Sequence, residues 1–237
     1  VEGIQFLGWR TVPVDESALG EQALSSLPKI IQFLALRQEP LAEDAFERCI
    51  YLIRKKIERR LALSNLSDAY IVSFSSRTLI YKGLMVAPQL ANFYLDLKDP
   101  LYESALAIFH QRYSTNTFPT WPLAQPFRML AHNGEINTLQ GNQNWMRARE
   151  ACMTSAFWGD EIVHLKPIIL PGGSDSANLD NVLESLVLSG RDPRHTMMML
   201  IPEAWENMPF LDTDLKAFYE YHACFSEPWD GPAAVAF

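Results

Sequence analysis

The sequence predicts an α+β protein in which helices pack on mixed sheets. In residues 43–63, apolar side chains recur at three- and four-residue steps, which is typical of an amphipathic helix. Short runs rich in β-branched and aromatic residues, such as 30–36 and 69–74, are typical of strands. The two kinds of segment interleave without regular βαβ spacing, which favours mixed sheets.

The first half of the chain predicts few elements. Residues 1–28 are mixed and turn-rich. A buried strand is predicted over 30–36, and the clearest helix follows over 43–63. Two strand-like runs, 69–74 and 78–82, are separated by a short polar link and predict a hairpin.

The middle of the chain predicts a strand over 105–112 and a loop over 118–126, where three prolines and a tryptophan cluster. A short strand over 129–132 runs into Asn133-Gly134, which is a strong turn signal. A helix is predicted over 142–153.

The last part predicts a loop at 171–173 and then an apolar helix over 179–188, with Ser174-Asp175 at its start. Another helix is predicted over 213–225, and 233–237 is typical of a strand. Because we see no internal linker, residues 1–237 are predicted to form a single domain.

The composition argues against several functional classes of protein. The 237 residues include 20 basic and 28 acidic side chains, for a net charge of −8, which does not suit a nucleic-acid or anionic-membrane partner. Apolar stretches are far shorter than the ~20 residues of a membrane helix. Three separated cysteines, Cys49, Cys152 and Cys224, indicate a reducing compartment, so we expect a cytoplasmic location, or the plastid stroma in a plant or alga.

A basic run lies within the strongest predicted helix. Because Glu58 interrupts it and the chain is acidic, we interpret it as a solvated helix face rather than a nucleic-acid site. Its members are Arg54, Lys55, Lys56, Arg59 and Arg60.

The stretch 110–144 has an unusual composition. Arg112 ends a predicted buried strand, where a guanidinium needs an anionic partner. That partner is either a nearby Asp or Glu, or the carboxylate of a ligand gripped by the planar guanidinium. Five asparagines also lie here, at positions 116, 133, 137, 142 and 144.

Two further pairs each allow two interpretations. Asn133-Gly134 is either an ordinary hairpin turn or an oxyanion hole, in which a side-chain amide and the next backbone N–H converge on one oxygen. Ser174-Asp175 is either a helix N-cap or a carboxylate that holds a ligand ammonium group. The five histidines show no paired ligand spacing, so we predict no metal site.

Four motifs resemble the class II, or N-terminal-nucleophile, glutamine amidotransferases and occur in that family's order. They are HxRYST at 110–115, QPF at 125–127, AHNGEIN at 131–137 and GGSDS at 172–176. The segments 29–37 and 88–97 resemble the ferredoxin-dependent form of glutamate synthase. Longer runs resemble the large subunits of the glutamate synthase branch of the family. These runs are 8–15, 81–85, 110–149 and 203–207.

The resemblance implies a four-layer αββα sandwich, two antiparallel sheets between helices, incomplete at both ends of this chain. It also implies the glutaminase portion of a glutamate synthase, in which glutamine hydrolysis yields ammonia for reductive amination of 2-oxoglutarate at a second site. By resemblance, Asn133 and Gly134 form the oxyanion hole, Arg112 binds the α-carboxylate of glutamine, and Asp175 binds its α-ammonium.

The family's nucleophile is a cysteine at the first residue of the mature chain, whereas residue 1 here is Val1. We therefore expect the nucleophile-bearing strand upstream of Val1 and closing strands beyond Phe237. This chain alone is then expected to be inactive. The alternative is a catalytically silent glutamine-binding or assembly module of a larger protein.

The resemblance implies no cofactor in this part of the polypeptide, and FMN and an iron–sulfur cluster downstream. The implied partners are glutamine, a synthase domain of the same polypeptide, and ferredoxin or an NAD(P)H-oxidising small subunit as electron donor. Neither a nucleic acid nor a membrane is implied.

Overall fold

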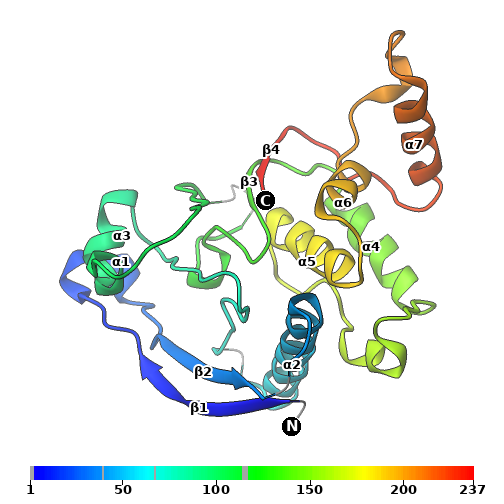
Figure 1. Cartoon of the computed structure of the whole chain (residues 1–237). Helices are drawn as coiled ribbons and strands as arrows, with labels where there is room; N and C mark the ends of the chain where they lie inside the picture. The colour runs from blue at the N-terminus through cyan, green and yellow to red at the C-terminus, as the bar shows by residue number, and fades with distance from the viewer. Residues whose placement is uncertain (1–2, 39, 67, 114–116) are drawn as a thin grey trace. The chain divides into compact units, whose positions relative to one another are not determined.

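A computed structural model describes residues 3–38, 40–66, 68–113 and 117–237. The chain folds into mixed α and β structure, as predicted, and its elements are labelled in Figure 1. It divides into two compact units, one formed by 1–127 with Phe237 and the other by 128–236. The single-domain expectation stays a prediction.

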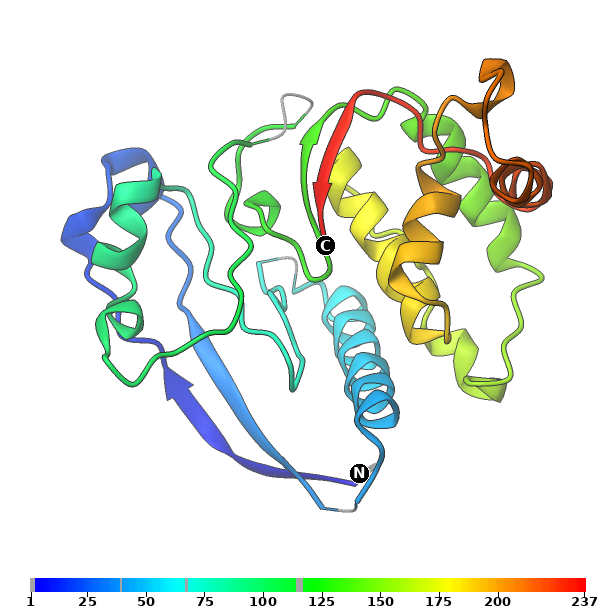
Figure 2. The same ribbon diagram turned by 45° about the horizontal axis from the view of Figure 1, so that its top comes forward.

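The first unit contains a long antiparallel ribbon of β1 (Ile4–Thr11) and β2 (Ile31–Arg37), which lie side by side in Figures 1 and 2. The predicted strand over 30–36 is confirmed as β2. No strand was predicted in the mixed, turn-rich residues 1–28, and β1 forms there because it pairs with residues 20 or more positions away. An irregularity between Phe6 and Gly8 breaks its local pattern.

Short elements surround the first unit's core. They are 3₁₀ turns at Glu16–Ala18, Leu95–Lys98 and Trp121–Leu123, and helices α1 (Glu21–Leu24) and α3 (Ala87–Phe93). The predicted loop over 118–126 is confirmed apart from its single 3₁₀ turn. The buried core cluster consists of Val12, Leu19, Ala23, Phe93, Tyr94 and Trp121.

The predicted helix over 43–63 is confirmed as α2 (Glu43–Leu63). The solvated-face interpretation of its basic run was wrong for two residues, because Arg54 is 1% and Lys55 5% exposed. They continue the stripe of buried Ile50 and Tyr51 at three- and four-residue steps. Glu58 compensates the buried charge, accepting from Arg54 Nη1 at 2.7 Å.

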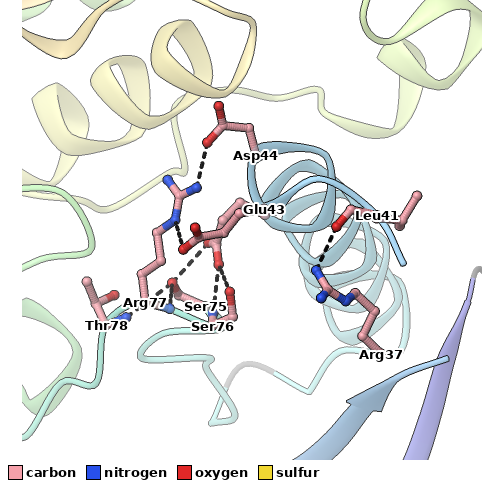
Figure 3. Close-up of polar contacts among 9 residues, drawn as sticks. Arg37, Leu41, Glu43, Asp44, Ser75, Ser76, Arg77 and Thr78 are labelled. Atoms are coloured by element: carbon pink, nitrogen blue, oxygen red, sulfur yellow. Dashed lines mark hydrogen bonds and ion pairs between the residues drawn. The ribbon is translucent and has the colours of Figure 1, made fainter. Parts of the chain in front are cut away.

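The predicted hairpin of 69–74 and 78–82 was wrong. Residues 69–82, all within the described part of the chain, contain no strand. The polar link between the two runs binds the start of α2 instead, as Figure 3 shows for Arg77, which pairs with Glu43 at 2.9 Å and Asp44 at 2.5 Å. Ser76 donates its backbone N–H and its hydroxyl to Glu47 Oε1 at 2.7 and 2.6 Å.

The predicted strand over 105–112 was also wrong. No strand occurs in this described segment, and its apolar residues Leu106 and Phe109 are 76% and 77% exposed. The segment has a strand-like composition, but within the described residues it has no neighbouring strand to pair with.

The second unit contains an antiparallel pair of β3 (Ala131–Gly134) and β4 (Ala233–Ala236), with Gly134 opposite Ala233. The strand predicted over 233–237 is confirmed. The strand predicted over 129–132 begins two residues later. The turn at Asn133-Gly134 was wrong, because both residues extend β3 and pair with β4.

The helices of the second unit begin with α5 (Asp175–Leu188), which lies beside the β3–β4 pair in Figures 1 and 2. The helix predicted at 179–188 is thus confirmed, with an earlier start. The helices predicted over 142–153 and 213–225 are confirmed with shifted ends. The remaining elements are α4 (Leu139–Glu150), α6 (Pro193–Leu200), α7 (Thr213–Ala223) and 3₁₀ turns at Gly159–His164 and Trp205–Asn207.

Within the described residues, no helix combines the length and apolar character needed to cross a bilayer.

Candidate active site

Asn133 presents a free amide at the end of β3. The residue is exposed, and its side chain has no hydrogen-bond partner among the residues that the structure describes. Opposite pairs in an antiparallel ladder alternate between hydrogen-bonded and non-bonded. Because Glu135 donates its N–H to Pro232 O at 3.0 Å, the neighbouring pair of Gly134 and Ala233 is non-bonded. The Gly134 N–H therefore points away from β4.

Gly134 occupies a position that only glycine fits. Its φ is +144°, and a Cβ placed there would lie 1.8 Å from the carbonyl oxygen of Pro232. Gly231 faces the mirror situation, since its Cβ would lie 1.8 Å from the carbonyl oxygen of Glu135. The two backbones thus approach too closely for any side chain, which fixes the end of β3 against the segment before β4.

Asp175 lies at the first position of α5 and is 1% exposed. Its Oδ1 accepts from the N–H of Ser176 at 2.7 Å, and its Oδ2 accepts from that of Ile136 at 3.1 Å. The cap interpretation belongs to Ser174, whose hydroxyl accepts from Ala177 N at 3.2 Å. The positive end of the helix dipole favours a carboxylate at this position.

The structure therefore brings Asn133, Gly134 and Asp175 together. Ile136, which Asp175 holds, lies two residues beyond Gly134. A pair of donors and a buried carboxylate at the start of a helix can bind a small molecule that carries both an oxygen acceptor and an ammonium group.

Two further contacts that the sequence did not predict bind β3 and the residues just before it to α5. His132 Nδ1 lies 2.8 Å from Ser176 Oγ, and both residues are buried. Asp180 Oδ1 accepts from the N–H groups of Met129 and Leu130 at 2.7 and 3.2 Å. The available signal was the number of polar residues in an otherwise buried helix.

Three of the four predicted residues belong to the second unit, and Arg112 belongs to the first. The argument from a buried strand end was wrong, because Arg112 is exposed and lies outside any strand. Within the described residues it forms no ion pair, and its backbone N–H donates to His110 Nδ1 at 3.1 Å. The last two residues of the HxRYST motif and Asn116 lie outside the described residues.

Two of the clustered asparagines hold the backbone around the site. Asn142 is buried, donates to Pro228 O at 2.9 Å and accepts from Thr138 Oγ1 at 2.7 Å. Asn137 donates its backbone N–H to Asp230 O at 2.8 Å. They fasten the segment before β4 along the residues that follow β3.

The three cysteines do not form a catalytic or metal cluster. Cys152 and Cys224 are exposed, and their thiols donate to main-chain carbonyls of Arg149 and Glu220. Cys49 lies inside α2. Across the described ranges, no three His, Cys, Asp or Glu side chains are placed to hold a metal ion.

This site lies in a chain whose full length, residues 1–237, matches the family model of the class-II glutamine amidotransferases. The chain belongs to that family. The order of its motifs agrees with this membership.

Curated proteins similar to this chain include glutamate synthases from bacteria, plants and yeast. The chain is 47% identical over 234 residues to the glutamate synthase [NADPH] large chain of Azospirillum brasilense, covering 99% of this chain and 15% of the relative. It is 48% identical over 241 residues to a chloroplastic ferredoxin-dependent glutamate synthase of Oryza sativa subsp. japonica, covering 100% and 15%. It is 48% identical over 240 residues to glutamate synthase [NADH] of Saccharomyces cerevisiae, covering 99% and 11%.

The chain therefore spans 11–15% of the length of these relatives. Relatives named for three different electron donors are about equally similar, so this region does not distinguish between donors.

Proposed function

We propose that the chain is the glutaminase portion of a glutamate synthase. It hydrolyses glutamine to glutamate and ammonia, and the ammonia passes to a synthase site elsewhere in the polypeptide for reductive amination of 2-oxoglutarate. The observation that carries the proposal is the pair of free donors at Asn133 and Gly134, tied through Ile136 to the buried carboxylate of Asp175.

In this mechanism a cysteine thiol attacks the carboxamide carbon of glutamine, and charge develops on the carbonyl oxygen. The Asn133 amide and the Gly134 N–H stabilise that oxyanion. Ammonia leaves, and water then releases glutamate from the thioester. Asp175 binds the α-ammonium, and Arg112 binds the α-carboxylate.

The thiol is supplied from outside these 237 residues. The thiols of Cys152 and Cys224 donate to main-chain carbonyls, which does not favour the reactive thiolate. FMN and an iron–sulfur cluster are likewise proposed to lie elsewhere in the polypeptide, and the three separated cysteines of this chain do not supply the set of thiolates that holds such a cluster. Ferredoxin or an NAD(P)H-oxidising subunit delivers the electrons there.

We also propose that the fold is a four-layer αββα sandwich of the N-terminal-nucleophile type, and that residues 1–237 are an interior portion of a single glutaminase domain. Family membership supports this, and so do apolar side chains left uncovered on the β1–β2 ribbon, such as Trp9 at 65% exposure. The protein is expected in the cytoplasm, or in the plastid stroma of a plant or alga.

Isotope transfer tests the function. The complete polypeptide is given glutamine labelled with 15N at the amide, 2-oxoglutarate, a reductant and excess unlabelled ammonium. We expect 15N in the amino group of newly formed glutamate, with little dilution by the unlabelled ammonium. Glutamine binding without any transfer of label would instead support a catalytically silent binding or assembly module.

Asp175→Asn is expected to lower kcat/KM for glutamine tenfold to a hundredfold. The change removes the negative charge that faces the α-ammonium, and one charge-assisted contact contributes about 1.5–3 kcal/mol. Steady-state glutaminase kinetics measure the effect. As a matched control, Ser174→Ala removes the cap of the same helix, costs about 1 kcal/mol of stability and leaves KM unchanged. Wild-type kinetics for Asp175→Asn would remove Asp175 from the substrate site.

Arg112→Lys is expected to weaken glutamine use by roughly 2–3 kcal/mol, because lysine keeps the charge but not the planar fork that binds a carboxylate. Glutamine-dependent and ammonia-dependent glutamate synthesis are measured side by side, and only the first should fall. Arg10→Lys serves as control, since Arg10 forms a comparable fork with Asp96, at 2.8 and 2.5 Å, within the first unit. Equal losses in both activities would contradict a role in glutamine binding.

A further inference from the structure

Asp180 is a buried carboxylate whose hydrogen bonds serve a distant part of the chain. Its exposure is 0%, and its Oδ1 accepts from the N–H groups of Met129 and Leu130, some 50 residues earlier in the sequence. Its Oδ2 has no hydrogen-bond partner among the described residues. Because burying a carboxylate is costly, a role in stability alone does not account for it.

Asp180 is one of three attachments between α5 and the segment 129–136. Ser176 binds His132 at 2.8 Å, and Asp175 binds the N–H of Ile136 at 3.1 Å. Ser176 and Asp180 are four residues apart and therefore lie on the same side of the helix. Asn133 and Gly134 lie between these attachments, so their position depends on all three.

Charged neighbours act on Asp180 in opposite directions. Burial raises the pKa of Asp180 to about 6, Glu184 of the same helix adds to the rise, and Arg128 before β3 opposes it. The N–H donors of Arg128 and Met129 also favour the charged form. This carboxylate consequently changes its charge close to physiological pH, unlike an exposed aspartate.

We propose that Asp180 is a positioning residue for the oxyanion pair: its carboxylate holds the strand that carries Asn133 and Gly134, and its protonation loosens that hold. The physical reason is that an ionised carboxylate accepts hydrogen bonds roughly twice as strongly as a neutral group. This inference rests on the proposed glutaminase function.

Asp180→Asn tests the proposal in the complete enzyme, because asparagine keeps the volume and an acceptor oxygen but not the charge. At neutral pH we expect kcat for glutamine hydrolysis to fall about tenfold, with KM nearly unchanged. The ratio of wild-type to variant kcat should approach one as the pH falls to about 5, because the wild-type carboxylate is then protonated too. The ratio cancels the effect on kcat of any other group that titrates equally in both proteins.

Asp212→Asn is a matched control in the same unit. Asp212 Oδ1 also accepts two backbone N–H groups, from Asp214 and Leu215 at 2.9 and 3.2 Å, but it caps α7. The same chemical change there should leave the kcat of glutamine hydrolysis unchanged at every pH.

Stability separates positioning from simple unfolding. A carboxyl whose pKa is raised by folding contributes stability below its unfolded pKa, and this contribution is lost as the pH rises through the folded value of about 6. At neutral pH the uncharged Asp180→Asn variant should therefore unfold at the same or a higher temperature than the wild type, while hydrogen exchange at Met129 and Leu130 becomes faster.

Glu184→Gln provides a second variant if Asp180→Asn does not fold. Removing the negative charge of Glu184 should lower the pKa of Asp180. The pH at which kcat falls on acidification should therefore be lower than in the wild type, which a merely structural role would not produce.

The proposal is overturned if Asp180→Asn keeps wild-type kcat, or if Glu184→Gln leaves the transition in place. If either result occurs while Asn133→Ala loses activity, only the positioning role of Asp180 is contradicted. If the wild-type enzyme itself has no glutaminase activity, the proposed function is contradicted as well.

Discussion

Gly134→Ala is expected to disrupt the end of β3 and destabilise the second unit by about 2–5 kcal/mol, which combines an unfavourable φ with overpacking. The added Cβ would lie 1.8 Å from Pro232 O and 2.8 Å from its carbonyl carbon, and both are backbone atoms that no rotamer change can move. Pairing of Gly134 with Ala233 then fails, and with it the position of the proposed oxyanion donor.

Local hydrogen exchange, read on peptides that cover β3 and β4, measures this change in a polypeptide of any size. Gly141→Ala is the matched control, because Gly141 lies within α4 and a Cβ there meets nothing within 4 Å. Alanine in that helix should add about 0.5–1 kcal/mol of stability. Equal exchange in the wild type and Gly134→Ala would mean that the backbone accommodates the added Cβ without loss of the β3–β4 pairing.

How much of the fold could be predicted depended on whether a segment's structure is set locally. The helix over 43–63 was predicted to the residue, because its apolar period and length are properties of that segment alone. The strand β1 and the extension of β3 through Asn133-Gly134 were missed, since each is fixed by a partner strand 20 or more residues away. The hairpin predicted over 69–82 does not form because of a non-local contact as well: the polar link between its two runs binds carboxylates on α2.

The candidate site divides in the same way. Asn133, Gly134 and Asp175 were predicted from motifs, and the structure groups them. The supporting residues His132, Ser176 and Asp180 were not predicted, because a buried polar contact requires knowledge of which segments meet. Arg112 was argued from a strand that does not form, so its proposed role depends on the family resemblance alone.

Asn133→Ala is expected to lower kcat for glutamine hydrolysis in the complete enzyme by on the order of 10²–10³, with a smaller change in KM. An oxyanion donor acts mainly on charge that develops in the transition state, so its loss affects turnover more than binding. The substitution should not disturb the fold, because Asn133 is exposed and its side chain forms no hydrogen bond within the described residues.

The β3–β4 pairing should therefore survive Asn133→Ala, and hydrogen exchange of both strands should match the wild type. Asn142→Ala is the contrasting variant, because its amide holds Pro228 O at 2.9 Å and accepts from Thr138. It should increase exchange around β4 and lower activity only in proportion. A rise in KM alone for Asn133→Ala would make Asn133 a substrate-binding residue, and a rise in exchange would make it structural. Only a fall in kcat with unchanged exchange identifies it as the donor that stabilises the oxyanion.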